Sequence, residues 1–237
     1  MASELRTARP LRPRSTSAPL HTVVLQSASA RSQSERAYLL IRDQIVTLQL
    51  APGSVIEEGR LREQLGLGRT PIREALQRLA HENLVSFVPH RGTFVCDINL
   101  TDLHRLTEVR IELEGCAARL AAERATARER ARMESLMAEL DTIDDSDVHT
   151  LMRLDQQIHG QVYQATRNSF LTTMLEENFN LSLRIWFLAL DRGVRLKAAV
   201  EEHRQLLAAI VARDGDRAAV LMRQHVSGFE QAIRKVL

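Results

Sequence analysis

The stretch of residues 66–84, GLGRTPIREALQRLAHENL, constrains the fold of this chain more than any other segment. Its apolar residues recur at intervals of three and four, which predicts a short helix with one buried face. Arg69, Arg73 and Gln77 are spaced four apart and fall on the opposite face. A helix of this kind fits the major groove of DNA. An ordinary amphipathic surface helix has the same pattern, so this stretch alone leaves both interpretations open.

The beginning of this helix is marked by a threonine followed by a proline. Thr70 is expected to be the N-cap, and Pro71 the first helical residue, where its missing N–H would be unpaired in any case. The arginines suit a groove because a planar guanidinium can donate two hydrogen bonds to guanine or to a phosphate.

The segments upstream supply the rest of a helix-turn-helix. Residues 35–48 carry apolar residues on one face and predict a first helix, after which the run APGSVI at 51–56 breaks the chain. Residues 58–65 predict a second short helix. Gly66 and Gly68 are expected to form the tight turn before the third helix.

Two short apolar runs downstream predict a β-hairpin. Residues 84–88 and 93–96 have the composition of strands, and they flank the turn PHRG at 89–92. A hairpin in this place makes the motif a winged helix-turn-helix, with His90 and Arg91 at the tip of the wing.

The sequence LGLGRTPIREALQRLAHENLV…PHRGTFV resembles the N-terminal domain of the GntR family of bacterial transcription regulators, over about residues 34–98. The resemblance implies a homodimer that binds an inverted-repeat operator in double-stranded DNA, with the wing near the minor groove. Gly68 stands where many relatives have serine, and Gly59 where some carry a phosphate-contacting arginine, which leaves Arg60 and Arg62 as substitutes. The predicted DNA contacts are Arg62, Arg69, Thr70, Arg73, Gln77, His90, Arg91 and Gly92.

Length and composition predict two domains. A chain of 237 residues with 44% apolar residues exceeds a typical single domain and can fill a sizeable core. The net charge of +2 hides an asymmetry, because residues 1–33 carry five arginines and one glutamate, whereas residues 34–98 carry eight basic and eight acidic groups. Residues 1–33 lack periodicity, so we expect a disordered basic arm, which either attracts phosphates or only adds solubility.

The sequence shows no sign of export or of a membrane span. The apolar run at 21–25 is too short for the core of a signal peptide, and no run approaches the length of a span. Cys96 and Cys116 lack CxxC spacing and are expected to be small core residues in a reducing compartment. We therefore expect a cytoplasmic protein without membrane contact.

The remainder of the chain is predicted to be helical. Short connections between the helices imply an antiparallel bundle. The predicted fold class is therefore mainly α, with a winged helix-turn-helix at 34–98 and an all-α bundle at 99–237. The motifs G-x-S-x-G, P-loop and dinucleotide fingerprint are missing, so we do not expect an enzyme. Helical spacing predicts six helices, near 101–124, 126–140, 146–166, 168–190, 195–213 and 215–236.

Four polar residues fall on stripes that the helical spacing assigns to the core of the bundle. Asp155 and His159 lie one turn apart in its third helix, His203 lies in the fifth, and His225 in the sixth. Each would be costly to bury alone, whereas one divalent cation would satisfy all four. One aspartate and three histidines suit zinc first, with nickel, manganese, cobalt or iron as alternatives. A hydrogen-bonded core network, or a surface pair of Asp155 and His159, is the competing interpretation.

Arg110 shares the inward stripe of the first helix of the bundle. A guanidinium in this place needs a negative partner, which is either an acid of the bundle or the carboxylate of a bound ligand. The spacing leaves both interpretations open.

The segments EVRIELEGCAARLAA, LDQQIHGQVYQATRNSFL, EEHRQLLAAIVARDGD and RQHV resemble the FCD effector domain of the FadR subfamily within the GntR family. The resemblance covers about residues 102–235, and six helices rather than seven are typical of the VanR-like group. It implies a metal bound by the four inward residues, an effector pocket faced by Arg110, and effectors that are small organic acids or related metabolites. Arg184 matches a recurrent basic position and is expected to be a second effector-binding residue.

These observations predict a ligand-responsive transcriptional regulator that acts as a repressor. A small carboxylate effector would bind at the metal and at Arg110, and would change the separation of the two recognition helices of a dimer. Operator half-sites have a fixed spacing of about 34 Å, so a modest shift would release the DNA. Two alternatives stay open, namely a metalloenzyme fused to a DNA-binding module and a pure metal sensor.

Overall fold

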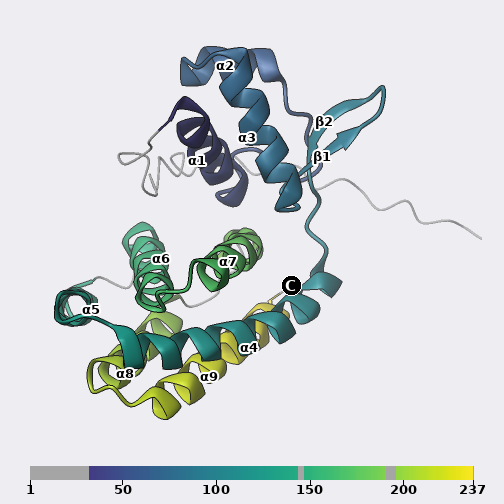
Figure 1. The fold of residues 1–237 in the computed structure, drawn as a ribbon. Coiled ribbons are helices and arrows are strands. Elements are labelled where there is room, and N and C mark those ends of the chain that lie inside the picture. The colour runs from purple at the N-terminus through teal and green to yellow at the C-terminus, as the bar shows by residue number, and fades with distance from the viewer. Residues whose placement is uncertain (1–31, 144–146, 191–195, 237) are drawn as a thin grey trace, which may run out of the picture.

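The computed structural model describes residues 32–143, 147–190 and 196–236, and Figure 1 shows them as two units joined by a linker between β2 and α4. Two clusters of buried apolar residues correspond to these units, except that Val46 of α1 belongs to the cluster of the lower unit. The predicted arm lies almost wholly outside the described residues. The elements are α1 (Gln33–Val46), α2 (Glu58–Leu65), α3 (Arg69–His81), β1 (Val85–Val88), β2 (Gly92–Val95), α4 (Leu100–Arg124), α5 (Ala127–Leu140), α6 (Val148–Ala165), α7 (Ser169–Leu190), α8 (Leu196–Val211) and α9 (Gly215–Arg234).

The upper unit is a winged helix-turn-helix. Helices α1 and α3 pack against each other, and their inward residues, including Ile41 and Leu76, are fully buried. Strands β1 and β2 pair antiparallel, with Val85 opposite Val95, and both of these side chains enter the core because they share one face of the hairpin. The hairpin projects away from the three helices in Figure 1.

The beginning of α3 differs from the prediction. The helix starts at Arg69 with Gly68 as its N-cap, so the prediction of Thr70 as the N-cap was wrong. Pro71 is then the third helical residue. It is tolerated there because the first four N–H groups of a helix have no partner within it. Gly66 alone takes the left-handed backbone of the turn, with a φ of 63°, whereas Gly68 is extended.

The lower unit is an antiparallel bundle of six helices, and their bounds lie within two residues of the predicted ones. Helix α4 runs beside α9 in Figure 1, and a row of buried alanines in α4 allows close approach of the neighbouring helices. The fold class predicted from the sequence is therefore confirmed. Cys96 is half-buried, but Cys116 is exposed, so its expected place in the core was wrong. Within the described ranges, every helix is too short or too polar to serve as a membrane span.

Gly160 offers a test of the packing around α6. It lies in the interior of this helix, and a Cβ added to it would meet no atom within 4 Å. Alanine is favoured over glycine inside a helix by about 0.5–1 kcal/mol, so Gly160→Ala should raise the melting temperature by about 1–4 °C. Gly115→Ala is the matched control in α4, because its Cβ would lie 2.8 Å from Nε of Arg223. Equal shifts for the two variants in a thermal melt would contradict this packing.

Candidate metal centre and nucleic-acid interface

The face of α3 predicted to read DNA lies in solvent. Arg69, Thr70, Arg73 and Gln77 are all exposed, while the opposite face of the helix is buried against α1. Arg73 is held in place by an ion pair to α2, in which its Nε lies 3.1 Å from Oε2 of Glu58. The pair is partly exposed, so a phosphate or a base edge can replace the carboxylate at little cost.

The wing presents its predicted residues at the turn between the strands. His90 and Gly92 both take a positive φ, of 60° and 111°, which makes the turn tight. The guanidinium of Arg91 lies 5.9 Å from the ring centroid of Phe94, and His90, Arg91 and Gly92 are exposed. Arg62 is exposed on α2. The eight residues predicted to contact DNA are thus accessible, and they come from α2, α3 and the wing.

The four residues predicted to hold a metal come together in the core of the bundle. Asp155, His159, His203 and His225 each offer a ligand atom, and these atoms all lie within 4.8 Å of one another. All four side chains are buried, with 5% exposure at most. The alternative of a surface pair between Asp155 and His159 is therefore excluded.

The geometry of this cluster fits a single cation. Nε2 of His159 lies 3.2 Å from Nε2 of His203, and two nitrogens bound to one zinc ion lie about 3.0–3.4 Å apart at ordinary bond angles. Both carboxylate oxygens of Asp155 are buried and, among the described residues, have no hydrogen-bond partner. A hydrogen-bonded core network would satisfy those oxygens, so the donor set is better matched to a divalent metal than to a network of this kind.

A second layer of oxygen atoms surrounds the histidines. Nδ1 of His203 lies 3.2 Å from the carbonyl of Val200, and Nδ1 of His225 lies 3.1 Å from Oε2 of Glu202. When Nδ1 of an imidazole donates its hydrogen to such an oxygen, the orientation of the ring is fixed. The lone pair that can bind a metal then lies on Nε2.

His159 has its own two neighbours in this layer. Its Nδ1 lies 2.9 Å from Oε2 of Glu114 and 3.2 Å from the hydroxyl of Tyr163. Neither of these neighbours was predicted from the sequence, and neither was Glu202. Glu114 follows Arg110 by four residues, and Tyr163 follows His159 by four, so a search for partners one helical turn away would have found them.

Arg110 has an acidic partner within the bundle. Its Nε donates a hydrogen bond of 2.6 Å to Oε1 of Glu114, and both side chains are buried. The guanidinium also lies 5.6 Å from the ring centroids of Phe179 and Phe229. Of the two interpretations left open for Arg110, the ion pair is therefore observed. Because Glu114 also touches His159, it links the predicted effector residue to the predicted metal centre.

Burial and neighbouring charges shift the pKa values of this cluster in different directions. Burial raises the pKa of Asp155 and, together with the nearby histidines, lowers the pKa of His203 well below its usual range. Burial also acts to raise the pKa of Glu114, but Arg110 and His159 outweigh it and bring the value to about 2. A deprotonated Glu114 and a neutral His203 are the states that an ion pair and a metal site require.

Arg184, the second residue predicted to bind the effector, lies outside the metal cluster. Its guanidinium donates a hydrogen bond to the carbonyl of Cys96 in the linker that joins the two units. It lines a cavity at this linker together with residues such as Asn83 and Ile185, and none of the four metal-cluster residues lines that cavity. The structure thus does not bring Arg184 together with Arg110 and the metal cluster.

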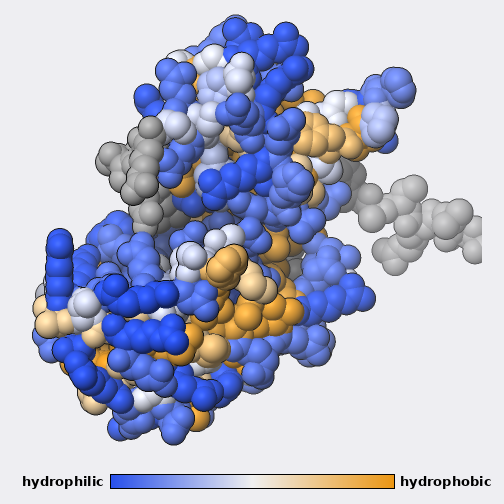
Figure 2. Space-filling view, viewed as in Figure 1, coloured by the Kyte–Doolittle hydropathy of each residue, from blue (hydrophilic) through white to orange (hydrophobic). Residues whose placement is uncertain are grey.

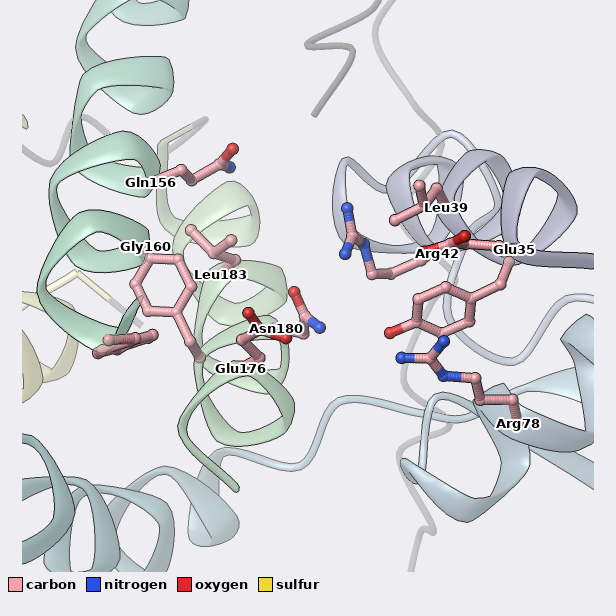
Figure 3. A pocket seen from close by; sticks show the side chains of 12 residues that line it. Glu35, Leu39, Arg42, Arg78, Gln156, Gly160, Glu176, Asn180 and Leu183 are labelled. Carbon is pink, nitrogen blue, oxygen red and sulfur yellow. The ribbon is translucent and has the colours of Figure 1, made fainter. Parts of the chain in front are cut away.

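A second cavity, of about 190 Å³, lies between the two units and is shown in Figure 3. Arg42 of α1 and Arg78 of α3 line one wall, and Gln156 of α6 and Asn180 of α7 line the wall opposite. Tyr163 also lines the cavity, while its hydroxyl contacts His159, so one aromatic side chain spans the distance from the cavity to the metal cluster.

Both units of the chain match known protein families. Residues 33–95 match the family described as bacterial regulatory proteins, gntR family, and residues 105–228 match the FCD domain. The HTH-type transcriptional repressor RspR of Escherichia coli K12 is 24% identical over 216 residues, which make up 91% of this chain and 95% of RspR. The HTH-type transcriptional repressor GlaR of the same organism is 28% identical over an aligned length of 203 residues, and the match covers 80% of this chain and 90% of GlaR. The Nta operon transcriptional regulator of Aminobacter aminovorans is 28% identical over 192 residues, or 81% of this chain and 90% of that protein.

Solved structures show the same fold. McbR/YncC of E. coli superposes with a TM-score of 0.72 at 24% identity, covering 84% of this chain and 98% of McbR. A GntR transcriptional regulator from Rhodococcus sp. RHA1 superposes with a TM-score of 0.65 at 19% identity, covering 86% of this chain and 99% of its own. At these identities the likeness establishes the fold alone.

Proposed function

Because this chain belongs to the GntR family of bacterial regulatory proteins and carries an FCD domain, we propose that it is a repressor that a small organic acid releases from its operator. The gntR family is a family of bacterial regulatory proteins, and the relatives are transcription regulators, so the chain is a regulator and not an enzyme. Two relatives, RspR and GlaR, are described as transcriptional repressors, which supports the proposed direction of control. A bacterial protein that binds operator DNA works in the cytoplasm.

The observation that carries the proposal is the pairing of two sites in one chain. An exposed face of α3 with guanidinium groups lies in the upper unit, and a buried Asp/His₃ cluster lies in the lower one. We assign residues 34–98 to DNA binding and residues 99–237 to effector binding and dimerisation. The first site would select the operator sequence. The second site would bind the effector and thereby change the affinity for the operator.

The proposed metal is a divalent transition ion, with zinc as the first choice. Asp155, His159, His203 and His225 would hold it, and it would supply a Lewis-acidic point of attachment for a carboxylate. Other residues of the chain would position the metal ligands and Arg110. Glu202 and the Val200 carbonyl orient two of the imidazoles, and Glu114 holds Arg110 beside the cluster.

Arg110 would recognise the charge of the effector. The guanidinium has five N–H donors, and the ion pair to Glu114 leaves some of them for an incoming carboxylate. An acid that binds here would also compete with Glu114 for Arg110, and Glu114 touches His159. Effector binding would therefore disturb both the ion pair and the second layer of the metal centre.

Tyr163 supports a route from the metal centre to the recognition helix. It contacts His159 and lines the cavity in Figure 3, where Arg78 of α3 lies on the far wall. The guanidinium of Arg78 stacks on Tyr38 at 3.6 Å, and Tyr38 donates a hydrogen bond of 2.9 Å to Glu82 just after α3. A movement of Tyr163 would thus change the shape of the cavity that Arg78 also lines. Arg78, Tyr38 and Glu82 would transmit this change to α3.

The proposed active form is a two-fold homodimer, which matches the symmetry of an inverted repeat. The bundle exposes apolar side chains that a partner subunit would cover. Val109 of α4 is 46% exposed, and Phe170 and Met174 of α7 are 85% and 50% exposed. Figure 2 shows an apolar area on the lower unit, between polar surfaces.

The proposal is tested with purified protein and DNA from the region upstream of its own gene and its neighbours. We expect a gel shift at one or more inverted repeats, and release of that DNA on addition of one member of a panel of small organic acids. Release by metal alone would indicate a metal sensor instead. A protein that binds none of these fragments would contradict the proposal.

Arg73 tests the role of α3. Arg73→Ala should weaken specific operator binding by about 1–3 kcal/mol, or roughly 5- to 150-fold, because a bidentate contact is lost while the fold is kept. Arg132→Ala is the control, since Arg132 is an exposed arginine of α5 paired with Glu139. Affinities are compared in gel-shift titrations at one salt concentration. Equal affinity of both variants and the wild type would remove Arg73 from the recognition surface.

A further inference from the structure

Arg184 is a buried guanidinium that lacks an acidic partner in the part of the chain that the structure describes. Its exposure is 2%, and its one hydrogen bond there goes to the carbonyl of Cys96. Its Nε is buried and, within the described ranges, has no hydrogen-bond partner. Arg110 is equally buried but has Glu114. A buried charge without a counter-ion is costly, so Arg184 calls for an anion that the fold itself does not provide.

The space around Arg184 is large enough for such an anion. The hinge cavity, as we name it, has a volume of about 500 Å³ and lies where the linker meets α4 and α7. Asn83, just beyond the end of α3, and the linker residues 96–99 form one side of it. Leu106, Leu181 and Ile185 form much of the other side. The cavity is therefore built from both units of the protein.

Three other charged side chains line the hinge cavity, namely Asp97, Asp102 and Arg105. Asp102 forms an ion pair with Arg105 at 3.2 Å. Asp97 is turned toward the loop before α2, since its Oδ1 lies 2.7 Å from the position that a Cβ on Gly53 would take. Asp97 attracts Arg184 electrostatically, but the two side chains form no ion pair in the described part of the chain. Arg184 is thus a buried charged group of this cavity that has no ion-pair partner among the described residues and can bind an anion.

We propose that the hinge cavity binds a small organic carboxylate with a short hydrocarbon part, and that Arg184 holds its carboxylate. The forked guanidinium matches the two oxygens of a carboxylate, and Nε is available for one of the two hydrogen bonds. The hydrocarbon part would lie against Leu106, Leu181 and Ile185. This site is separate from the metal centre, with which it shares no residue, and it does not depend on the function proposed for that centre.

Occupancy of the hinge cavity would change the relation between the two units. Arg184 already holds the linker through the Cys96 carbonyl, and Asn83 lies just beyond the end of the recognition helix. A carboxylate bound between these groups and α7 would favour one arrangement of α3 over others. Operator affinity would therefore respond to this ligand even in protein that lacks the metal.

The test uses full-length protein and sodium hexanoate as the probe. Binding is followed by calorimetry and by the fluorescence of Trp186, the single tryptophan of the chain, which lies on α7 two residues from Arg184. We expect saturable binding of one hexanoate per chain, and binding at least tenfold weaker for hexanamide, which has the same shape without the charge. Arg184→Gln should weaken hexanoate binding at least tenfold. Arg184→Lys, which keeps the charge but lacks the fork, should bind hexanoate more tightly than Arg184→Gln and more weakly than the wild type.

Asp155→Asn separates this site from the metal centre. It should leave hexanoate binding within about twofold of the wild type, because Asp155 does not line the hinge cavity. Equal binding of hexanoate and hexanamide, or equal binding by wild type and Arg184→Gln, would overturn the proposal. Loss of binding in Asp155→Asn together with full binding in Arg184→Gln would also overturn it, and would place the carboxylate at the metal centre instead. If Arg184→Gln does not fold, Leu181→Trp serves in its place, since it should block the cavity and abolish binding.

Discussion

Replacing Glu114 with glutamine is expected to destabilise the protein by about 3–5 kcal/mol, because it leaves a buried guanidinium without a counter-charge. Arg110 is 4% exposed and Glu114 is 1% exposed, so water cannot take over the role of the carboxylate. The loss should be seen in urea unfolding curves as a lower midpoint with an unchanged slope.

Two further variants show whether the ion pair is the cause. Glu139→Gln breaks the exposed pair between Arg132 and Glu139 and should cost less than about 1 kcal/mol. The double variant Arg110→Met/Glu114→Leu removes both buried charges and should recover most of the stability lost in Glu114→Gln. A double variant no more stable than Glu114→Gln would show that packing, and not the unpaired charge, explains the loss.

Metal binding is expected to stabilise the wild-type protein by about 4 kcal/mol when the free metal concentration is a thousand times its dissociation constant. The site joins α6, α8 and α9, which come together only in the folded bundle, so the metal binds the folded state alone. Differential scanning fluorimetry with added zinc, nickel or manganese measures the rise in melting temperature.

Asp155→Asn provides the matched control for this stabilisation. In the absence of metal the variant should be at least as stable as the wild type, because it removes a buried carboxylate whose oxygens have no hydrogen-bond partner among the described residues. With metal, its melting temperature should rise far less than that of the wild type. A variant that is less stable without metal and equally stabilised by it would show that Asp155 has a structural role only.

The bundle was largely predictable from the sequence because each of its helices buries a continuous apolar stripe. The same stripes placed Asp155, His159, His203 and His225 in the core, where the structure brings them together. The beginning of α3 was mispredicted because a threonine before a proline has the chemistry of an N-cap, while the turn actually ends two residues earlier. Capping residues act over one or two positions, and tertiary packing of the preceding turn decides between them.

Contacts between helices were not predictable in the same way. Helical spacing shows that Arg110 points inward, but it does not show which of several possible partners lies opposite. The position of Arg184 against the linker depends on how α7 packs below the upper unit, and no periodicity within α7 contains that information. Tyr163 has the spacing of an ordinary core residue, and only the fold shows that it lies between the metal cluster and the cavity of Figure 3.

The most direct test of the metal centre is elemental analysis of full-length protein that has met neither a chelator nor a metal-affinity resin. We expect about one transition-metal ion per chain in the wild type, as one Asp/His₃ set binds one ion, and much less in His203→Ala. The same samples are then titrated with zinc, nickel and manganese in a thermal melt. Absence of metal from the wild type, together with no rise in melting temperature for any of the three ions, would show that these four residues are a buried polar cluster and not a metal site.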